Sequence, residues 1–268
     1  MKLFTFFLFS FCLINYSTFA NFGNHTPFLK SDGTVWATGD NGQGGLGDGT
    51  TGTDRLYPVQ VTDSTTNPIT NISAIAAGGA HTVFLKNDGT VWATGQNNNG
   101  ELGIGNTTQQ NRAVQVTDSS GNYITNVSAI AAGYNHTVFL KNDGTAWATG
   151  NNVQGELGDG TTNNNQRAEP VTDSTTNPIT SISAIAAGAN HTVFLKNDGT
   201  VWATGYNSQG ELGIGNTTQQ NRAVQVTDST TNPITSISAI AAGANHTVFL
   251  KNDGTVWATG YNLSLIHI

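Results

Sequence analysis

Hydrophobic and polar positions follow one pattern that returns at a fixed interval along the chain. In one copy, the small apolar run SAIAAG (128–133) predicts a strand in a crowded place. HTVFLK (136–141) is β-branched and aromatic, which favours a second strand. NDG (142–144) predicts a hairpin turn, and TAWATG (145–150) predicts the return strand. The pattern is therefore that of antiparallel strands without a helical stretch.

Histidines and tryptophans at fixed places mark the period. Successive intervals are 56, 55, 55 and 55 residues for both residue types. A Gly- and Asn-rich segment at 151–170 and a turn at 173–178 complete one period, which gives it about four short strands. Four-stranded units that repeat every 40 to about 55 residues predict an all-β fold, the β-propeller. The marker residues are His25, His81, His136, His191 and His246, with Trp36, Trp92, Trp147, Trp202 and Trp257.

Small and large side chains have different places in the predicted blade. The Ala-rich strand fits the innermost position, where blades converge and large side chains would collide. The aromatic pair Phe139 and Trp147 fits the space between blades, because each blade is half a core that its neighbours complete. The predicted repeats are 21–73, 74–128, 129–183, 184–238 and a partial unit at 239–262.

Three segments carry a resemblance to a known family. IAAGGAHTVFL (75–85), NDGTVWATG (87–95) and NGELGIG (99–105) resemble the repeat of the regulator of chromosome condensation family, in order and in spacing. The resemblance extends over residues 22–262. It implies a propeller, and members of the family usually have seven blades.

The number of repeats departs from that pattern. Four long periods are followed by a fifth that stops at Asn262, so we expect an incomplete ring of four to five blades from a seven-bladed parent. The tail 263–268 replaces the expected Gly-x-Leu-Gly loop with apolar residues, and we interpret it as non-native and the chain as a fragment. Pro27 replaces the valine of HTVFL and has no N–H to donate, which fits a strand that lacks a neighbour.

Residues 1–20 have the pattern of a secretory signal peptide. Lys2 precedes an apolar run of about a dozen residues, and a short polar stretch ends at Ala20. An N-terminal membrane anchor is the alternative, although the run is short for spanning a bilayer. Removal at Ala20 also removes Cys12, the one cysteine, so disulfides would not stabilise the mature chain. We expect a secreted or extracellular protein, with the periplasm or cell surface as alternatives.

Charge narrows the range of partners. The formal net charge is −7, and 10% of the residues are charged. The basic residues are spread evenly over the repeats, whereas nucleic-acid binding needs clustered Lys and Arg to displace counterions. We therefore expect no nucleic-acid partner, and no membrane association after signal removal.

The repeated histidines, tryptophans and glycines predict a structural role. A metal site needs ligands that converge within a few ångströms, whereas equivalent positions on separate blades lie apart around a ring. We expect each imidazole to bond to backbone at a blade junction and each indole to pack between blades. Besides His81, His136, His191 and His246 and Trp92, Trp147, Trp202 and Trp257, the predicted structural set contains Gly78, Gly133, Gly188 and Gly243.

Sequence signals for a calcium site, a phosphate site or a catalytic site are weak. Asp40, Asp48 and Asp54 lack the spacing of a calcium hand and can equally cap turns. GELGIG lacks the Gly-Lys-Ser/Thr of a phosphate loop and is followed by no helix. No Ser/His/Asp set or carboxylate pair stands apart from the repeat, so we expect no cofactor, no metal and no enzymatic activity.

Positions that differ between the repeats are the candidates for ligand contact. Tyr134, Tyr206 and Tyr261 flank predicted strands and should reach loops, where binding specificity is usually carried. Arg112 and Arg222 complete the predicted ligand-binding set. Ordinary surface variation is the alternative explanation.

Two function classes follow. The first is a secreted, non-enzymatic propeller scaffold that binds a protein or a cell-surface polymer through loops on one face. The alternative, implied by the resemblance, is guanine-nucleotide exchange on a small GTPase. The signal peptide and the acidic charge favour the first.

Overall fold

The computed structural model describes residues 23–261, and these residues form strands and turns without a helix. The all-β prediction is therefore confirmed. The predictions for 1–20 and 263–268, including the signal peptide, Cys12 and the non-native tail, lie outside the described residues. No described helix is long and apolar enough to cross a membrane.

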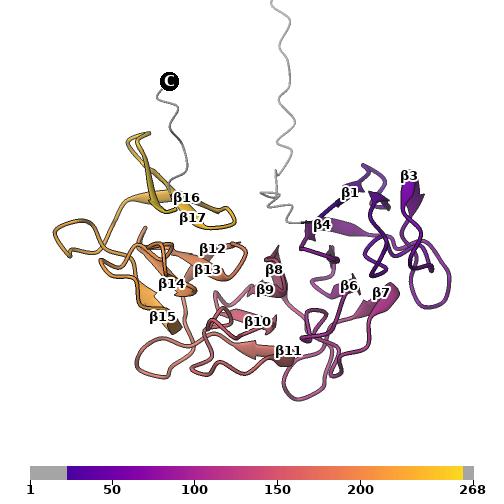
Figure 1. Cartoon of the computed structure of the whole chain (residues 1–268), viewed down its shortest axis with the longest axis horizontal. Helices are drawn as coiled ribbons and strands as arrows, with labels where there is room; N and C mark the ends of the chain where they lie inside the picture. The colour runs from indigo at the N-terminus through magenta and orange to yellow at the C-terminus, as the bar shows by residue number, and fades with distance from the viewer. Residues whose placement is uncertain (1–22, 262–268) are drawn as a thin grey trace, which may run out of the picture.

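The strands form five antiparallel sheets, which we number as blades in chain order (Figure 1). The first blade contains β1 (His25–Leu29), β2 (Val35–Gly39) and β3 (Arg55–Gln60). The second contains β4 (Ile72–Ala77), β5 (His81–Lys86), β6 (Val91–Gly95) and β7 (Gln110–Gln115). The third contains β8 (Val127–Ala132), β9 (His136–Lys141), β10 (Ala146–Gly150) and β11 (Asn165–Pro170). The fourth contains β12 (Ile182–Ala187), β13 (His191–Lys196), β14 (Val201–Gly205) and β15 (Gln220–Gln225), and the fifth β16 (Ile237–Ala242), β17 (His246–Lys251) and β18 (Val256–Gly260).

Each complete blade is a meander in which consecutive strands pair. In the third blade, Phe139 pairs with Trp147, and Gly144 in the hairpin between them has a φ of 78°. This left-handed conformation favours glycine, which explains the repeated Asn-Asp-Gly turn. The four predicted strand segments are thus confirmed, although the sheets of the second to fifth blades each begin two residues before the predicted repeat boundary.

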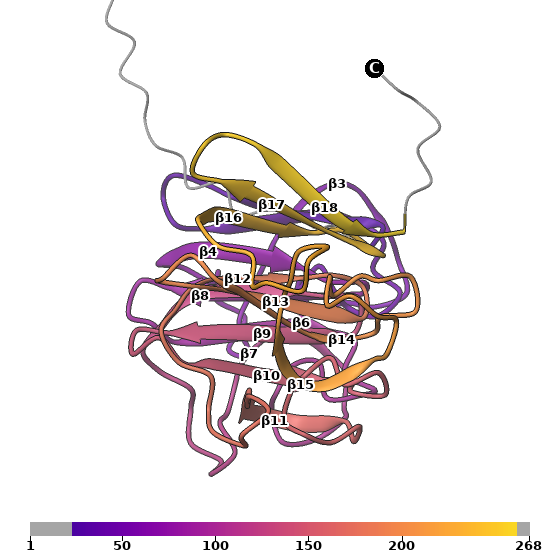
Figure 2. The same ribbon diagram turned by 90° about the vertical axis from the view of Figure 1, so that its left-hand side faces the viewer.

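The core lies between blades rather than inside them. Val83 and Leu102 of the second blade pack in one cluster with Ile130 and Phe139 of the third. Equivalent clusters join the other neighbours. The innermost strands β4, β8, β12 and β16 contact one another in turn, which places the Ala-rich segments around the axis, where small side chains allow close approach. Figure 1 shows the blades following one another along an arc, and Figure 2 shows from the side how the fifth blade lies next to the fourth.

The molecule has two faces, which we name by the turns on them. The hairpin face carries the turns between second and third strands, such as 142–144. The turn face carries the turns between first and second strands, such as 133–135. Because His136 pairs with Gly150, the ends of the third strands also lie on the turn face.

The two terminal blades have three strands each among residues 23–261. In that range β1 pairs with β2 alone, so Pro27 lies on an edge strand as predicted. Phe28 is 43% exposed, whereas its counterpart Phe139 is fully buried against the preceding blade. At the other end, Val256 is 64% exposed, whereas Val201 is fully buried.

Candidate binding surface

A histidine and a threonine join each blade to the next. The ring of His81 in the second blade reaches a threonine in the third, with 3.0 Å between Nε2 and Oγ1. The same geometry recurs with separations of 2.9 to 3.0 Å. The four pairs are His25–Thr82, His81–Thr137, His136–Thr192 and His191–Thr247.

The threonine determines the tautomer of the histidine. Thr137 Oγ1 donates its proton to the carbonyl oxygen of Glu101 at 2.7 Å, so it accepts from His81. Nε2 of His81 therefore carries the ring proton, and the imidazole is neutral. The sequence predicted a backbone partner for each imidazole. The partner of Nε2 is a side chain of the next blade, which itself bonds to backbone, and His25 also has a backbone hydrogen bond with His81.

Burial makes these imidazoles poor acids and bases at neutral pH. Desolvation lowers the pKa of His81 and His136 to about 3 and that of His191 to about 4, with smaller contributions from neighbouring histidines. Burial also lowers the pKa of His25, although Asp40 opposes the shift. Within residues 23–261 no group of three or more His, Cys, Asp or Glu side chains is placed to hold a metal ion.

The first glycine of each such turn leaves room for the histidine ring. A Cβ atom built on Gly133 would lie 2.1 Å from Cε1 of His136 and 2.6 Å from the carbonyl oxygen of Gly188. The second contact is with backbone of the next blade and cannot be relieved by a rotamer change. The Ala-Ala-Gly-x-x-His motif therefore packs a glycine against its own histidine at the blade junction.

The fifth blade carries the same motif in a different environment. His246 is exposed and Trp257 is 42% exposed, because no described sheet packs against the side of this blade that faces away from the fourth blade. The predicted inter-blade packing of these two residues is absent within residues 23–261.

A lysine lies over each repeated tryptophan, which the sequence analysis missed. Lys141 Nζ is 4.4 Å from the centre of the Trp147 ring, and four further pairs lie within 5.8 Å. Such cation–π contacts are worth about 0.5–1 kcal/mol at exposed sites. The signal was available, because every repeat has lysine six residues before tryptophan.

Backbone hydrogen bonds link the inner turns of the turn face. Gly79 N donates to Tyr134 O at 2.9 Å, Tyr134 N donates to Ala189 O at 3.2 Å, and Ala189 N donates to Ala244 O at 3.2 Å. Tyr134 is thus fixed by a bond on each side, while its side chain is 49% exposed. This combination suits a preorganised contact residue.

The other predicted ligand residues lie elsewhere. Tyr206 and Tyr261 follow third strands on the turn face, half-buried and 45% exposed respectively. Arg112 and Arg222 belong to the outermost strands β7 and β15, where they donate to Thr62 and Thr172 of the preceding blade. The arginines therefore link blades on the outer rim, and the structure does not bring the five residues into one cluster.

Buried glutamates lie beneath the turn face and were also missed. Glu101, Glu156 and Glu211 occupy the same place in the Gly-Glu-Leu-Gly loops and are at most 1% exposed. Glu101 accepts three hydrogen bonds, from Gln96 and Asn99, whereas Oε1 of Glu211 has no partner. Burial raises the pKa of Glu156.

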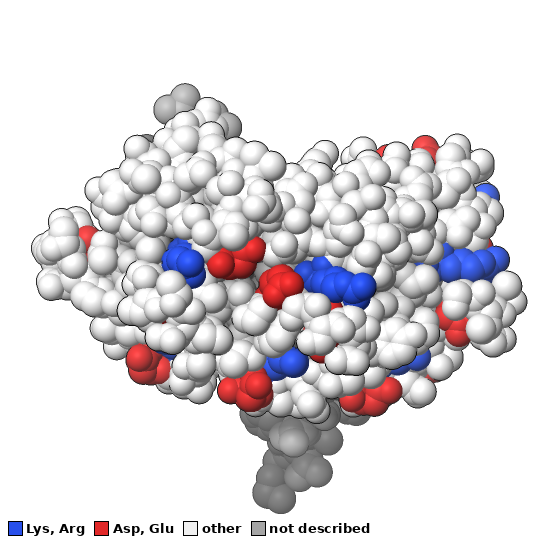
Figure 3. Space-filling model, turned by 90° about the horizontal axis from the view of Figure 1, so that it is seen from below, with Lys and Arg blue, Asp and Glu red and all other residues white. Residues whose placement is uncertain are grey.

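Charged residues are few on the side of the molecule drawn in Figure 3. Figure 3 shows scattered residues of both signs on a mostly uncharged surface. Asp48, weighed above as a calcium ligand, instead forms an ion pair with Arg55 at 2.7 Å. Asp40 and Asp54 accept backbone hydrogen bonds in the same loop, as turn-capping residues do.

Comparison with known proteins gives a consistent picture. A family model described as the RCC1-like domain matches residues 14–265. The ultraviolet-B receptor UVR8 of Arabidopsis thaliana is 29% identical over 248 residues, which cover 89% of this chain and 52% of the receptor. The RCC2 homologue of Danio rerio is 26% identical over 219 residues, covering 71% of this chain and 42% of that protein. The chain thus spans about half the length of these relatives.

Solved structures show the same fold. Human WBSCR16 superposes with a TM-score of 0.74 at 20% identity, covering 90% of this chain and 60% of that one. Yeast RCC1 (Prp20) bound to Kap60 gives 0.71 at 21% identity, covering 89% and 54%. Prp20p of Saccharomyces cerevisiae, studied for its binding to Gsp1p and histones, gives 0.67 at 23%, covering 89% and 56%. The β-propeller prediction is confirmed.

Proposed function

The chain belongs to the RCC1-like domain family, and from this premise we propose that it is a non-enzymatic scaffold that binds another protein through its turn face. Prp20p binds proteins, which supports a protein partner for a related propeller. The receptor UVR8 is likewise related along 89% of this chain.

One observation carries the proposal. The repeated histidines His81, His136 and His191 are buried and bonded between blades, so these three side chains join blades and are not accessible as acids or bases. The exposed residues there are those that vary between repeats, such as Tyr134 and Tyr261. A rigid scaffold with variable exposed tyrosines is typical of a recognition surface.

We further propose that the protein acts outside the cytosol. This rests on the basic start and apolar run within residues 1–20. A cell-surface polymer is the other ligand class that such a location makes available.

Site-specific cross-linking tests the surface. A photo-reactive residue at position 134 or 261 should give a discrete adduct with material from the source cells, and excess unmodified protein should suppress it. Tyr123 is the matched control, because it is 61% exposed and lies in the β7–β8 connection on the hairpin face. Equal labelling at all three positions, or none, would contradict the proposal.

Guanine-nucleotide exchange is the alternative function. It predicts that the protein accelerates release of a fluorescent nucleotide from a small GTPase. Acceleration that is lost in Tyr134→Ser and kept in Tyr123→Ser would replace the scaffold proposal. Cell fractionation with a C-terminal tag checks the location independently.

A further inference from the structure

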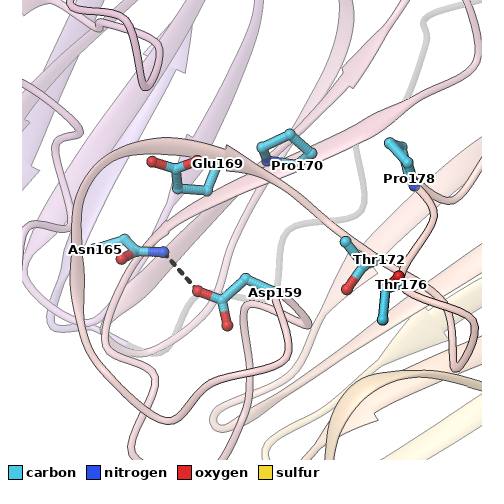
Figure 4. A pocket seen from close by; sticks show the side chains of 7 residues that line it. All are labelled: Asp159, Asn165, Glu169, Pro170, Thr172, Thr176 and Pro178. Atoms are coloured by element: carbon cyan, nitrogen blue, oxygen red, sulfur yellow. Dashed lines mark hydrogen bonds between the residues drawn. The ribbon is translucent and has the colours of Figure 1, made fainter.

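The outer rim of the third blade contains a cavity that the turn-face proposal does not use. Its volume is about 330 Å³. Figure 4 shows Asp159, Asn165 and Glu169 on one side and Thr172 and Thr176 on the other. Pro170 and Pro178 complete the lining.

The first blade shows what occupies the equivalent place there. Arg55 pairs with Gly39 as Asn165 pairs with Gly150, so Arg55 and Asn165 hold the same position. Arg55 directs its guanidinium to Asp48, with 2.7 Å from both Nε and Nη2 to Oδ2. Nη2 also donates to Thr50 Oγ1 at 2.9 Å. A carboxylate and a hydroxyl together therefore bind a guanidinium in this loop.

The third blade keeps these two groups without the cation. Asp159 accepts a hydrogen bond from Asn152 Nδ2 at 3.1 Å, as Asp48 does from Asn41. Asp159 also accepts hydrogen bonds from Thr161, the counterpart of Thr50. In place of the arginine, Asn165 Nδ2 donates to Asp159 Oδ2 at 2.8 Å. The amide is shorter and neutral, so it neither balances the carboxylate nor fills the cavity.

Glu169 adds a second carboxylate that is particular to this blade. It pairs with Ala148, and the residues paired at the same place in the other blades are Val59, Val114 and Val224. Burial raises the pKa of Glu169, and the acidic neighbours Asp159 and Asp118 raise it further, against a hydrogen bond from Ser119. The charged groups that act on Glu169 are thus of its own sign.

Neither Asp159 nor Glu169 takes part in an ion pair within residues 23–261. The ion pairs within residues 23–261 are Lys30–Asp32 and Arg55–Asp48. Arg222, on the neighbouring blade, donates through Nη1 to Thr172 on the far wall at 2.6 Å, and its guanidinium lies against Gly160, next to Asp159.

We propose that this cavity binds a guanidinium group supplied from outside the chain, in the place that Arg55 fills in the first blade. The planar fork matches a carboxylate and a hydroxyl, as it does at Asp48 and Thr50. In the cavity Asp159 supplies the carboxylate, and Thr172 and Thr176 supply the hydroxyls of the lining. The two prolines give an apolar wall for the stem that carries the group. The inference stands apart from the turn-face proposal, because neither Tyr134 nor Tyr261 lines the cavity.

Titration of the full chain followed by NMR tests the site. The ligands are N-acetyl-arginine amide, its lysine counterpart and calcium chloride. Shifts of the Asn165 side-chain amide should saturate with the arginine compound, and the lysine compound should bind at least about tenfold more weakly, because an ammonium lacks the fork. Equal binding of lysine, displacement by calcium, or no shift would overturn the assignment.

Substitutions test which residues form the site. Asn165→Arg places the first-blade residue in the cavity and should abolish binding. Glu169→Val restores the residue of the other blades and should weaken binding about tenfold. Gln110→Arg is the matched control, because it makes the same change in the second blade, which has Ile104 in place of Asp159. Binding retained by Asn165→Arg and Glu169→Val would contradict the site.

A last comparison identifies the source of the group. A peptide with an internal arginine that binds at least as tightly as free agmatine indicates an arginine side chain of a protein partner. Binding of agmatine alone indicates a small guanidinium compound. Both outcomes support the site, and failure of both overturns it while leaving the turn-face experiments unaffected.

Discussion

The Nε2 atom of His136 lies 3.0 Å from the Oγ1 atom of Thr192, and this bond joins the third blade to the fourth. Both side chains are buried, and the threonine hydroxyl donates a hydrogen bond to the carbonyl oxygen of Glu156 at 2.8 Å. A buried donor that loses its acceptor costs more than the bond itself contributes. The pair is therefore a sensitive point of the fold.

Removal of either partner should destabilise the protein. We expect His136→Ala to lower the free energy of unfolding by about 2–4 kcal/mol and Thr192→Val by about 1–3 kcal/mol. The double variant should lose less than the sum, which urea unfolding would measure. His246→Ala is the control, because this exposed histidine should change stability by less than about 0.5 kcal/mol. Unchanged stability in His136→Ala with loss of ligand binding would instead indicate a functional histidine.

The buried histidines should make the protein sensitive to mild acid. Their folded pKa values are about 3 for His81 and His136 and about 4 for His191, below the unfolded value near 6.5. Below pH 6.5 the unfolded chain binds more protons, so stability is complete above that pH and falls as the pH drops toward about 4. Each histidine contributes at most roughly 1.4 kcal/mol per pH unit.

This pH window separates the histidines from carboxylates whose pKa is lowered, such as Asp32. Asp32, with a folded pKa of about 2, affects stability only below its unfolded value of 3.8, and Glu156, whose pKa is raised, opposes the loss. Denaturant unfolding between pH 7 and 4.5 should show the decline, with a smaller slope in His136→Gln. His246→Gln should keep the slope of the unchanged protein. A stability that is flat from pH 7 to 4.5 would refute this assignment.

Gly133→Ala and Gly243→Ala should differ sharply in their effect on stability. A methyl group on Gly133 would meet the backbone oxygen of Gly188 at 2.6 Å, so Gly133→Ala must move one blade relative to the next. At Gly243 the close atoms all belong to the exposed His246 side chain, which can rotate away. We expect a loss of about 2 kcal/mol or more for Gly133→Ala and less than about 1 kcal/mol for Gly243→Ala. Thermal unfolding distinguishes them, and equal effects would disprove the junction geometry.

Replacement of a buried glutamate by glutamine should lower stability at Glu101 but not at Glu156. Glu101 accepts hydrogen bonds from Gln96 and Asn99, so Glu101→Gln turns an acceptor toward donors and should destabilise by about 1 kcal/mol. Burial disfavours the charge of Glu156 more than the backbone hydrogen bonds from Gln154 and Glu156 favour it, so Glu156→Gln should be neutral or stabilising at pH 7. Urea midpoints at pH 7 give the comparison. A loss in Glu156→Gln equal to that in Glu101→Gln would contradict the difference in hydrogen bonding.

Much of the blade could be read from the repeat. The strands, the hairpin glycine Gly144 and the inner place of the Ala-rich segment follow from local pattern and crowding. The partner of His136 could not, because Thr192 is 56 residues away and becomes a neighbour only when blades pack. The cavity at Asp159 depends likewise on a comparison of loops in three dimensions. The substitution of Asn165 for Arg55 gains meaning only when both are seen on the same strand position.

The sequence alone determined the strand order, the pairing of each strand with the next and the period of the fold, because these depend on neighbours along the chain. Tertiary structure decided which side chains are covered. HTVFLK occurs identically at 191–196 and 246–251, yet Leu195 is 5% exposed and Leu250 is 38% exposed. The two copies differ only in whether another described blade lies against them. Burial, and with it the protonation of each histidine, depends on the neighbours packed against it and not on the local sequence.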